Sequence, residues 1–233
     1  MAKQRIASEN SCSHPFERTP VTLKTSETHH RTLVIACGAV AREIAFLIEA
    51  NGWSGFTVHS IPAEFHNTPE RIADAVRARI EEVREEFDQI FCAYADCGTR
   101  GQLDALLEEE GVARLPGAHC YQFFAGEALF GRLTDEEPGT FYLTDFLVEH
   151  FDRLVIGGLG LDRHPELHDE YFKNYKRVVY LSQREEPGEW LERARCAAQR
   201  LSLEFEHHVT GYGELEHSLK RLAAARDDGY GSR

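Results

Sequence analysis

The chain has 233 residues, of which 42% are hydrophobic and 28% are charged, a composition typical of one large α/β domain or two small ones. Its net charge of -13 and its lack of a Lys/Arg-rich run argue against nucleic acid as a partner and against a polybasic membrane patch, because both need a basic face. No apolar run approaches the roughly 18 residues of a membrane span, so a small molecule or another protein is the expected partner.

Residues 1–30 are polar throughout and contain no apolar core of a secretory signal. They predict a disordered N-terminal extension on a cytoplasmic protein. Thiols stay reduced in the cytosol. The six cysteines are therefore interpreted as core, metal-binding or catalytic residues before disulfides are considered.

Short apolar runs alternate with helical patterns along the first half of the chain. Strands are predicted over 32–36, 56–61 and 89–95. Helices are predicted over 39–50, 69–86, 102–110 and 121–133, with a turn or short strand over 115–120.

The second half continues the alternation. Helices are predicted over 142–151, 165–174, 189–201 and 214–225, and strands over 154–156, 177–181 and 204–209. A polar tail follows over 226–233. The pattern indicates a Rossmann-like α/β fold over 31–225, with a mostly parallel sheet covered by helices on both faces. A weak echo between LVIACG (33–38) and LVIGGL (154–159) suggests two similar βαβ halves, 31–136 and 137–225.

Three cysteines follow strands or turns at positions where α/β proteins place their sites. Cys37 and Cys97 each end a predicted strand and precede a glycine, Gly38 or Gly98, which lets the backbone turn and leaves the sulfur uncovered. Cys120 follows a Pro-Gly turn and stands beside His119. Three thiols at one edge, with His119 as a ligand or a hydrogen-bond donor, predict a metal site, although no C-x-x-C pair marks it.

Several chemistries fit these thiols. Zinc, the first choice, could take three thiolates, or two and His119, and keep one position open for substrate. A [4Fe-4S] cluster with three cysteine ligands and one open iron is the alternative. Without a metal, Cys97 is the best candidate for a nucleophile, since it stands at a strand–helix junction. The remaining thiols Cys92 and Cys196 lie within a strand and a helix and are interpreted as packing residues.

A glycine-rich turn over 157–166 is the second candidate element. Gly158 and Gly160 leave room for an anion or ligand against the backbone, whereas the P-loop lysine and the full G-x-G-x-x-G spacing are missing. Asp162 and His164, together with Asp96, are the candidates for proton transfer or substrate orientation. The alternative is an ordinary loop in which Asp162 caps a helix. His66, which precedes another predicted helix, could reach the same edge but is interpreted as a hydrogen-bonded loop residue.

Six motifs in order resemble the uncharacterised family known as domain of unknown function 1638. They are ACGAVARE (36–43), PAEFHNTPERI (62–72), YADCGTRGQLD (94–104), GAHCYQFFAG (117–126), EPGTFYLTDFL (137–147) and GLGLDRHPEL (158–167). The resemblance covers about 32–215 and implies that the cysteine elements form one site. It also implies genes that lie beside those of corrinoid-dependent methyltransferases. Thr68 and Arg100 stand where the family pattern leads us to expect arginine and glycine, which puts a shared substrate in question.

Residues and resemblance together predict a metal-binding, enzyme-like protein of corrinoid-linked one-carbon metabolism, such as a metal-dependent transferase. A zinc ion would hold a substrate thiol as an anion. The rival hypothesis is a non-catalytic accessory protein that binds a corrinoid protein or delivers a cofactor. A closed pocket with convergent polar groups favours the enzyme, and a broad exposed apolar or acidic face favours the accessory protein.

Overall fold

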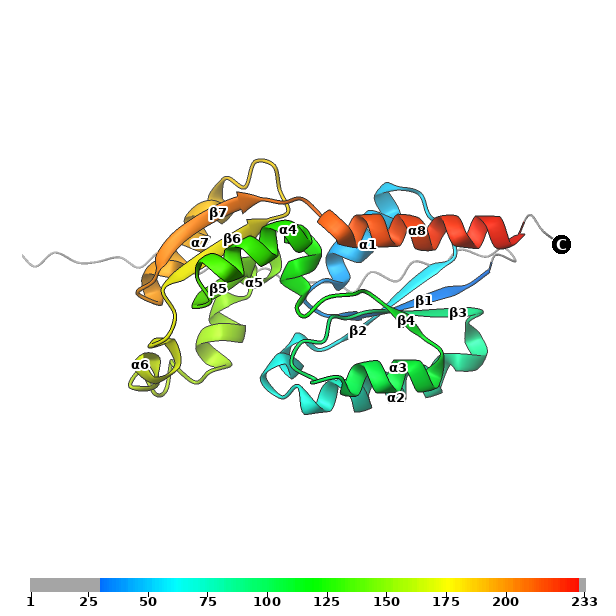
Figure 1. Cartoon of the computed structure of the whole chain (residues 1–233), viewed down its shortest axis with the longest axis horizontal. Coiled ribbons are helices and arrows are strands. Elements are labelled where there is room, and N and C mark those ends of the chain that lie inside the picture. Colours follow the sequence, from blue (N-terminus) through cyan, green and yellow to red (C-terminus); the bar gives the residue numbers. More distant parts are fainter. Residues whose placement is uncertain (1–29, 231–233) are drawn as a thin grey trace, which may run out of the picture.

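The protein consists of two lobes, each built on its own parallel sheet (Figure 1). The computed structural model describes residues 30–230, so the predicted N-terminal extension lies, except for His30, outside the described residues. No helix within that range has the length and apolar character needed to cross a membrane.

The first lobe is a four-stranded sheet in the order β2 (Phe56–Ile61), β1 (Thr32–Cys37), β3 (Gln89–Ala93) and β4 (Ala113–Arg114). All six residues of β1 are buried because helices cover both faces of the sheet. The helices α1 (Ala41–Ala50) and α8 (Gly213–Tyr230) lie on one face, and α2 (Glu70–Val83) and α3 (Gln102–Glu110) lie on the other (Figure 1). Two 3-10 helices, Ala63–Asn67 and Arg84–Glu86, flank α2.

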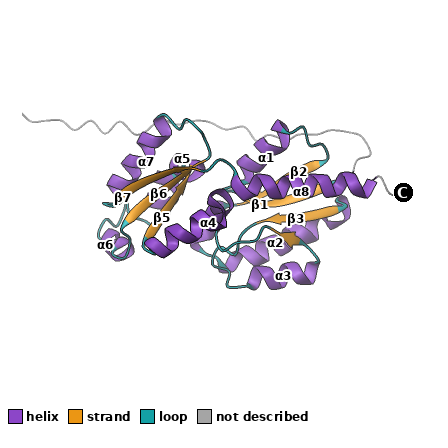
Figure 2. Ribbon diagram, turned by 45° about the horizontal axis from the view of Figure 1, so that its top comes forward, coloured by secondary structure: helices purple, strands orange, loops and turns teal. Residues whose placement is uncertain are grey.

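The second lobe is a three-stranded sheet in the order β5 (Thr140–Thr144), β6 (Arg177–Ser182) and β7 (Glu204–Val209) (Figure 2). Alternate residues of β6 enter different cores, Val178 and Tyr180 on one face and Val179 and Leu181 on the other. The first core contains residues of α7 (Glu189–Arg200), and the second contains Leu133 of α4 (Cys120–Glu136). The short helices of this lobe are α5 (Asp145–Glu149), the π-helix Asp152–Gly157 and α6 (Leu167–Phe172).

Helix α4 joins the lobes. Its start places Phe123 and Phe124 in the core of the first lobe, and Leu133 near its end packs on the second sheet. Between them Gly126 has φ 73°, a left-handed conformation that kinks the helix and that glycine adopts without strain. After β7 the chain returns to the first lobe, where α8 packs against α4 and α1. Residues 140–209 are thus an insertion into the first lobe.

The predicted α/β class and the parallel pairing are confirmed, with the strands divided between two sheets. The helix predicted over 142–151 is wrong in its first part: Thr140–Thr144 is strand β5, and the Thr144 hydroxyl then caps α5 by accepting from the Leu147 N–H at 3.4 Å. The strand predicted over 154–156 is wrong, because this stretch is a π-helix that continues from α5, with the Leu154 N–H donating to the His150 carbonyl at 2.8 Å. The echo of LVIACG therefore marks no second strand. The first part of the predicted tail, 226–230, belongs to α8, and the rest lies outside the described residues.

Candidate functional site

Loops at the carboxyl ends of β1, β2 and β3 meet the start of α4 at the edge of the first sheet that faces the second lobe. They bring together Cys37, Cys97, Cys120 and His66, which we call the cysteine cluster. The three cysteines are buried, with exposed fractions of 1%, 6% and 7%. The convergence follows from the parallel sheet, whose strands all end at one edge.

The Cys37 sulfur lies in the turn between β1 and α1. The Ala39 N–H donates to Cys37 Sγ at 3.3 Å, a contact that fixes the position of the sulfur. A Cβ at Gly38 would lie 3.1 Å from the carbonyl oxygen of Ile61. Glycine thus allows close contact with β2 here, and its predicted part in uncovering the sulfur stays a prediction.

His66 comes from the 3-10 helix after β2. Its two ring nitrogens each lie 3.9 Å from Cys37 Sγ, and Nδ1 is 2.9 Å from the Ala63 carbonyl oxygen. Its ring stacks on Tyr94, with the two centroids 6.3 Å apart. Burial alone would lower the pKa of His66, but its interactions with the Cys37 and Cys97 thiols raise it to about 11. His66 therefore brings a positive charge to the sulfurs.

A constrained loop after β3 positions Cys97. The residue has φ 48°, unusual for a residue other than glycine, and its N–H donates to the Ala118 carbonyl at 2.9 Å. The carboxylate of Asp96 accepts from the N–H groups of Gly98 and Gly101 at 3.2 and 3.0 Å and from the Thr99 hydroxyl at 2.7 Å. Asp96 thus organises the loop that holds Cys97. Its predicted part in proton transfer stays a prediction.

Cys120 is the first residue of α4, and the exposed residue His119 precedes it with an extended backbone. Interaction with the Cys120 thiol is the largest cause that lowers the pKa of Cys97 far below its ordinary value; burial opposes this, and His119 and His66 lower it further. The interaction with Cys97, followed by burial, raises the pKa of Cys120. The lowered pKa favours the thiolate form of Cys97, and the Cys120 thiol and the His66 ring are the neighbours that stabilise it.

Tyr94 adds an unpaired polar atom beside the sulfurs. The residue is fully buried, and its hydroxyl has no hydrogen-bond partner within the part of the chain that the structure describes. Burial raises the pKa of Tyr94, as do the neighbouring Cys37 and Cys97. A buried hydroxyl without a partner costs roughly 1–3 kcal/mol. A hydrogen-bond donor kept beside the sulfurs at this cost suits a site that binds a negatively charged sulfur or ligand.

The donor set suits a soft or borderline metal ion, since three thiols and an imidazole are ligands of zinc and of iron–sulfur clusters. Among residues 30–230, however, no three or more His, Cys, Asp or Glu side chains have the spacing that they would have around a bound ion. The three thiols and the imidazole of the cysteine cluster do lie near one another, and the binding of a metal ion would require these side chains to move closer together.

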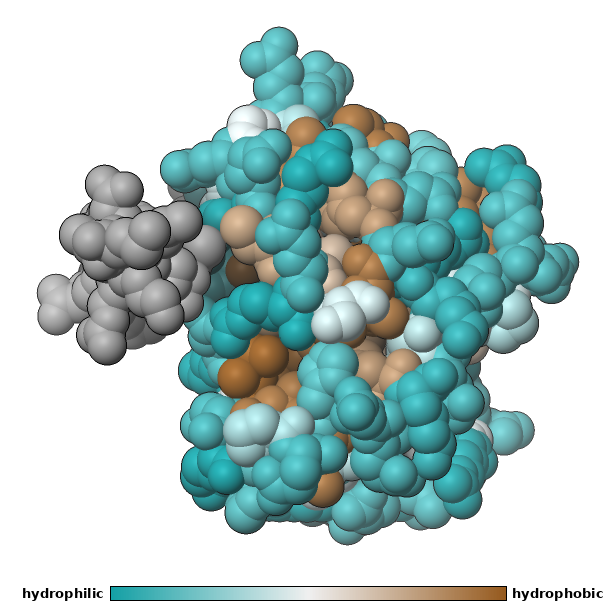
Figure 3. Space-filling model, turned by 90° about the vertical axis from the view of Figure 1, so that its left-hand side faces the viewer, coloured by the Kyte–Doolittle hydropathy of each residue, from teal (hydrophilic) through white to brown (hydrophobic). Residues whose placement is uncertain are grey.

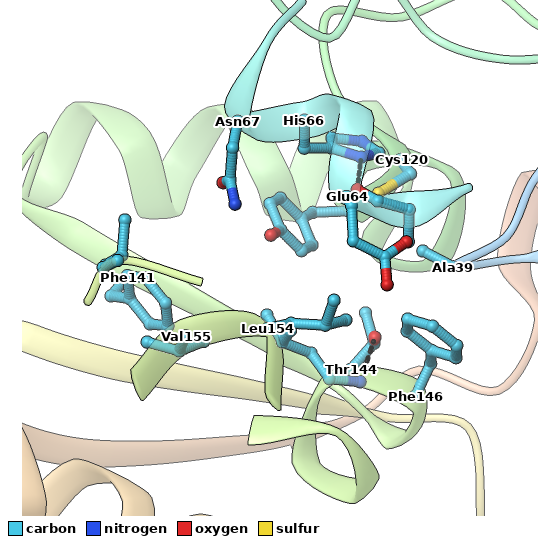
Figure 4. Close-up of a pocket in the computed structure, with 14 residues that line it drawn as sticks. Ala39, Glu64, His66, Asn67, Cys120, Phe141, Thr144, Phe146, Leu154 and Val155 are labelled. Carbon is cyan, nitrogen blue, oxygen red and sulfur yellow. Dashed lines mark hydrogen bonds between the residues drawn. The ribbon is translucent and has the colours of Figure 1, made fainter. Parts of the chain in front are cut away.

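A cavity of about 180 Å³ lies between the lobes, against the cluster (Figure 4). Cys120 and His66 line one side of it, and Phe141, Thr144 and Phe146 of the second lobe line the other. Two ion pairs join the lobes nearby, Arg42 with Glu149 and Arg153 with Glu64. Concave sites between structural units are typical places for small ligands.

The glycine-rich turn is not brought to the cluster. Asp162 and His164 are exposed, and His164 Nδ1 lies 3.2 Å from a carboxylate oxygen of Glu166. Neither residue lines the cavity, although Leu159 of the same turn does. A Cβ at Gly158 would clash with the backbone carbonyl of Leu154, and Gly160 has φ 72°, so both glycines serve the path of the backbone. The roles predicted for Asp162, His164, Gly158 and Gly160 stay predictions.

The other two cysteines among residues 30–230 do not line the cavity. Cys92 is fully buried in β3, and burial raises the pKa of its thiol to about 12, which leaves it neutral. Cys196 is half-buried on α7.

Sequence reasoning missed Tyr94 and gave His66 a loop role. Tyr94 stands three residues before Cys97 at the end of a strand, and His66 follows the strand that neighbours β1. The order of the parallel strands was the signal that could have placed both of them at this edge.

The thiolate makes a pH test possible. Because the pKa of Cys97 is lowered, the metal-free protein should keep one thiolate when the pH falls from about 8 to about 6, where an ordinary cysteine with a pKa near 8.5 is protonated. The ultraviolet absorbance of thiolates should therefore exceed that of Cys97→Ser by one equivalent at both pH values. Identical spectra of the two proteins at pH 6 would contradict the ionised Cys97.

The fold and the cluster define a two-lobed α/β protein with a buried cysteine–histidine site at the junction of its lobes. A family model described as "Protein of unknown function (DUF1638)" matches residues 60–219, more than half of the chain. The chain belongs to this family. The matched range includes His66, Cys97 and Cys120, whereas Cys37 precedes it. Neither the curated proteins nor the solved structures contain a match to the chain.

Proposed function

We propose that the cysteine cluster binds one metal ion, zinc in the first instance, and that the protein is an enzyme that activates a small substrate at this ion. The observation that carries the proposal is the meeting of three thiols from three separate segments, one of them with a lowered pKa, beside a cavity between two lobes. Residues that serve packing alone would not need a thiolate and an imidazolium in a buried place.

Cys37, Cys97 and Cys120 would hold the ion. A zinc ion at this place would act as a Lewis acid that keeps a substrate thiol in its anionic form. His66 would be a fourth ligand or a hydrogen-bond donor to the sulfurs, and His119 would donate from the exposed side. The Tyr94 hydroxyl, which lies buried beside the sulfurs without a hydrogen-bond partner among the described residues, would donate to one of them. Under the alternative hypothesis, the same three cysteines would be the ligands of a [4Fe-4S] cluster.

A second candidate function is nucleophilic catalysis by Cys97 without a metal. The low pKa of its thiol and the imidazolium of His66 favour it, because a thiolate beside a histidine is the form of an activated cysteine. The side chains of the cysteine cluster do not have the spacing of a formed metal site, which also favours a nucleophilic Cys97.

Elemental analysis and an absorption spectrum of protein purified without oxygen separate these functions. One equivalent of zinc and no visible absorption support the zinc site, and about four equivalents of iron with visible absorption support the cluster. Protein without metal that also takes up none from added zinc or iron, and in which iodoacetamide modifies Cys97 first, would replace the metal proposal by the nucleophile.

The resemblance noted in the sequence supports a place in corrinoid-linked one-carbon metabolism, and the cavity supports an enzyme rather than an accessory protein. The face shown in Figure 3 is mostly hydrophilic, with apolar side chains in a broken band between polar ones. Among the described residues the large exposed apolar side chains are Phe46, Tyr171 and Val209, on three different elements. Gel filtration of the protein with a corrinoid protein tests the accessory role, which requires a stable complex.

A further inference from the structure

We propose that the cavity between the lobes takes a small thiol with an uncharged, apolar body of about six to eight heavy atoms. The sulfur of this ligand faces Cys120 and His66, and its body lies against the second lobe. The inference rests on the proposed metal site for the sulfur end and on the cavity alone for the body.

The walls of the cavity determine the body of the ligand. Most of the lining side chains are apolar, and they come from both lobes: Ala39, Ala63, Phe141, Phe146, Leu147, Leu154, Val155 and Leu159. Figure 4 shows Leu154, Val155, Phe141 and Phe146 on the side opposite to His66 and Cys120. The volume of about 180 Å³ slightly exceeds the roughly 150 Å³ of a buried apolar cavity that holds benzene. A ring or branched chain with one or two further atoms fits.

The charges of the lining exclude a charged body. No lysine or arginine is among the described residues that line the cavity. Its one carboxylate, Glu64, is half-exposed and forms an ion pair with Arg153 across the lobes. The charged His66 lies at the polar end of the cavity, opposite the apolar wall. A carboxylate, sulfonate or phosphate on the body of the ligand would therefore lose its water without gaining a cation.

The polar end of the cavity determines the head of the ligand. Cys120 lines the cavity, whereas Cys37 and Cys97 are not part of its wall. A ligand in the cavity therefore reaches the cluster from the side of Cys120. A sulfur is the donor that suits an ion already held by thiolates.

Three probes of similar size test the head and the body separately. Calorimetric titration of the zinc-loaded full chain uses benzyl mercaptan, 3-mercaptopropionate and toluene. We expect benzyl mercaptan to bind at least about tenfold more tightly than each of the others. Toluene should bind detectably whether or not zinc is present. Equal binding of benzyl mercaptan and 3-mercaptopropionate would overturn the apolar body, and equal binding of benzyl mercaptan and toluene would overturn the thiol head.

A variant that fills the cavity provides the structural control. Leu154→Trp should weaken toluene and benzyl mercaptan at least about tenfold with unchanged zinc content, whereas Leu191→Trp, at a half-buried residue of the same lobe outside the cavity, should change neither. If the indole ring of Leu154→Trp prevents folding, Leu154→Phe is measured in its place. Toluene that fails to bind, or that binds the filled variant equally well, overturns the cavity proposal. A chain that takes up no zinc but binds toluene in this cavity overturns the proposed function and the thiol head, and leaves the apolar site supported.

Discussion

Replacing Cys97 by serine is expected to lower the affinity for zinc by at least about 100-fold, so that protein purified without oxygen retains less than a tenth of an equivalent. Loss of an outer-shell partner alone typically costs 10- to 100-fold, and loss of a ligand costs more. Cys97 is the thiol whose pKa is lowered, and its sulfur interacts with Cys120, His119 and His66. Metal content by elemental analysis, measured together with the circular dichroism of the variant, is the readout.

Two cysteines outside the cluster provide the controls. Cys196→Ser, at a half-buried position on α7, should retain the full metal content. Cys92→Ala removes a fully buried thiol that burial keeps neutral, so it should reduce stability slightly and leave the metal bound. Full metal content in folded Cys97→Ser, or loss of metal in folded Cys92→Ala, would show that other thiols hold the ion.

The Gly213→Ala substitution is expected to lower the free energy of unfolding by about 3 kcal/mol or more, and the melting temperature by roughly 6–12 °C. An added Cβ would lie 2.6 Å from the carbonyl oxygen of Phe123 and still closer to that of Phe124. Both neighbours are backbone atoms at the kinked start of α4, which cannot move as a flexible side chain can. Thermal unfolding followed by circular dichroism measures the effect.

Gly211→Ala is the matched control. Gly211 also has a positive φ, 59° against 48° for Gly213, but an added Cβ there meets nothing within 4 Å. It should cost only the strain of the left-handed backbone, about 1 kcal/mol. If both variants lose the same stability, the close packing of the start of α8 on α4 does not contribute, and the backbone conformation explains the whole effect.

The predictions for the first lobe needed only local patterns. Residues 56–61 and 102–110 form the strand and the helix expected of them, because their apolar patterns are clear and a glycine ends the helix. Thr140–Thr144 was harder, because five residues of mixed pattern precede a helix and only their pairing with β6 makes them a strand. The division into two sheets depends on such long-range pairing, which single-residue propensities do not contain.

The part of the site that follows from the positions of the strand ends could be predicted from the sequence. Cys37, Cys97 and Cys120 were grouped because each follows a strand or turn at one edge. The place of His66 depends on a 3-10 helix that turns its ring back onto Cys37, and the 3.9 Å contacts between them join residues 29 positions apart. The cavity could not be anticipated, since its walls come from both lobes and its shape depends on how they pack.

The return of α8 to the first lobe has a consequence for protein synthesis. Leu215 and Leu219 are fully buried in the same core as Phe123 and Phe124, although they are translated about 90 residues later. While the ribosome makes the inserted lobe, the first lobe therefore exposes an apolar groove that only the last helix can cover. A nascent chain that ends before α8 should bind chaperones and resist proteolysis poorly, even though every cysteine and histidine of the candidate site has already been made.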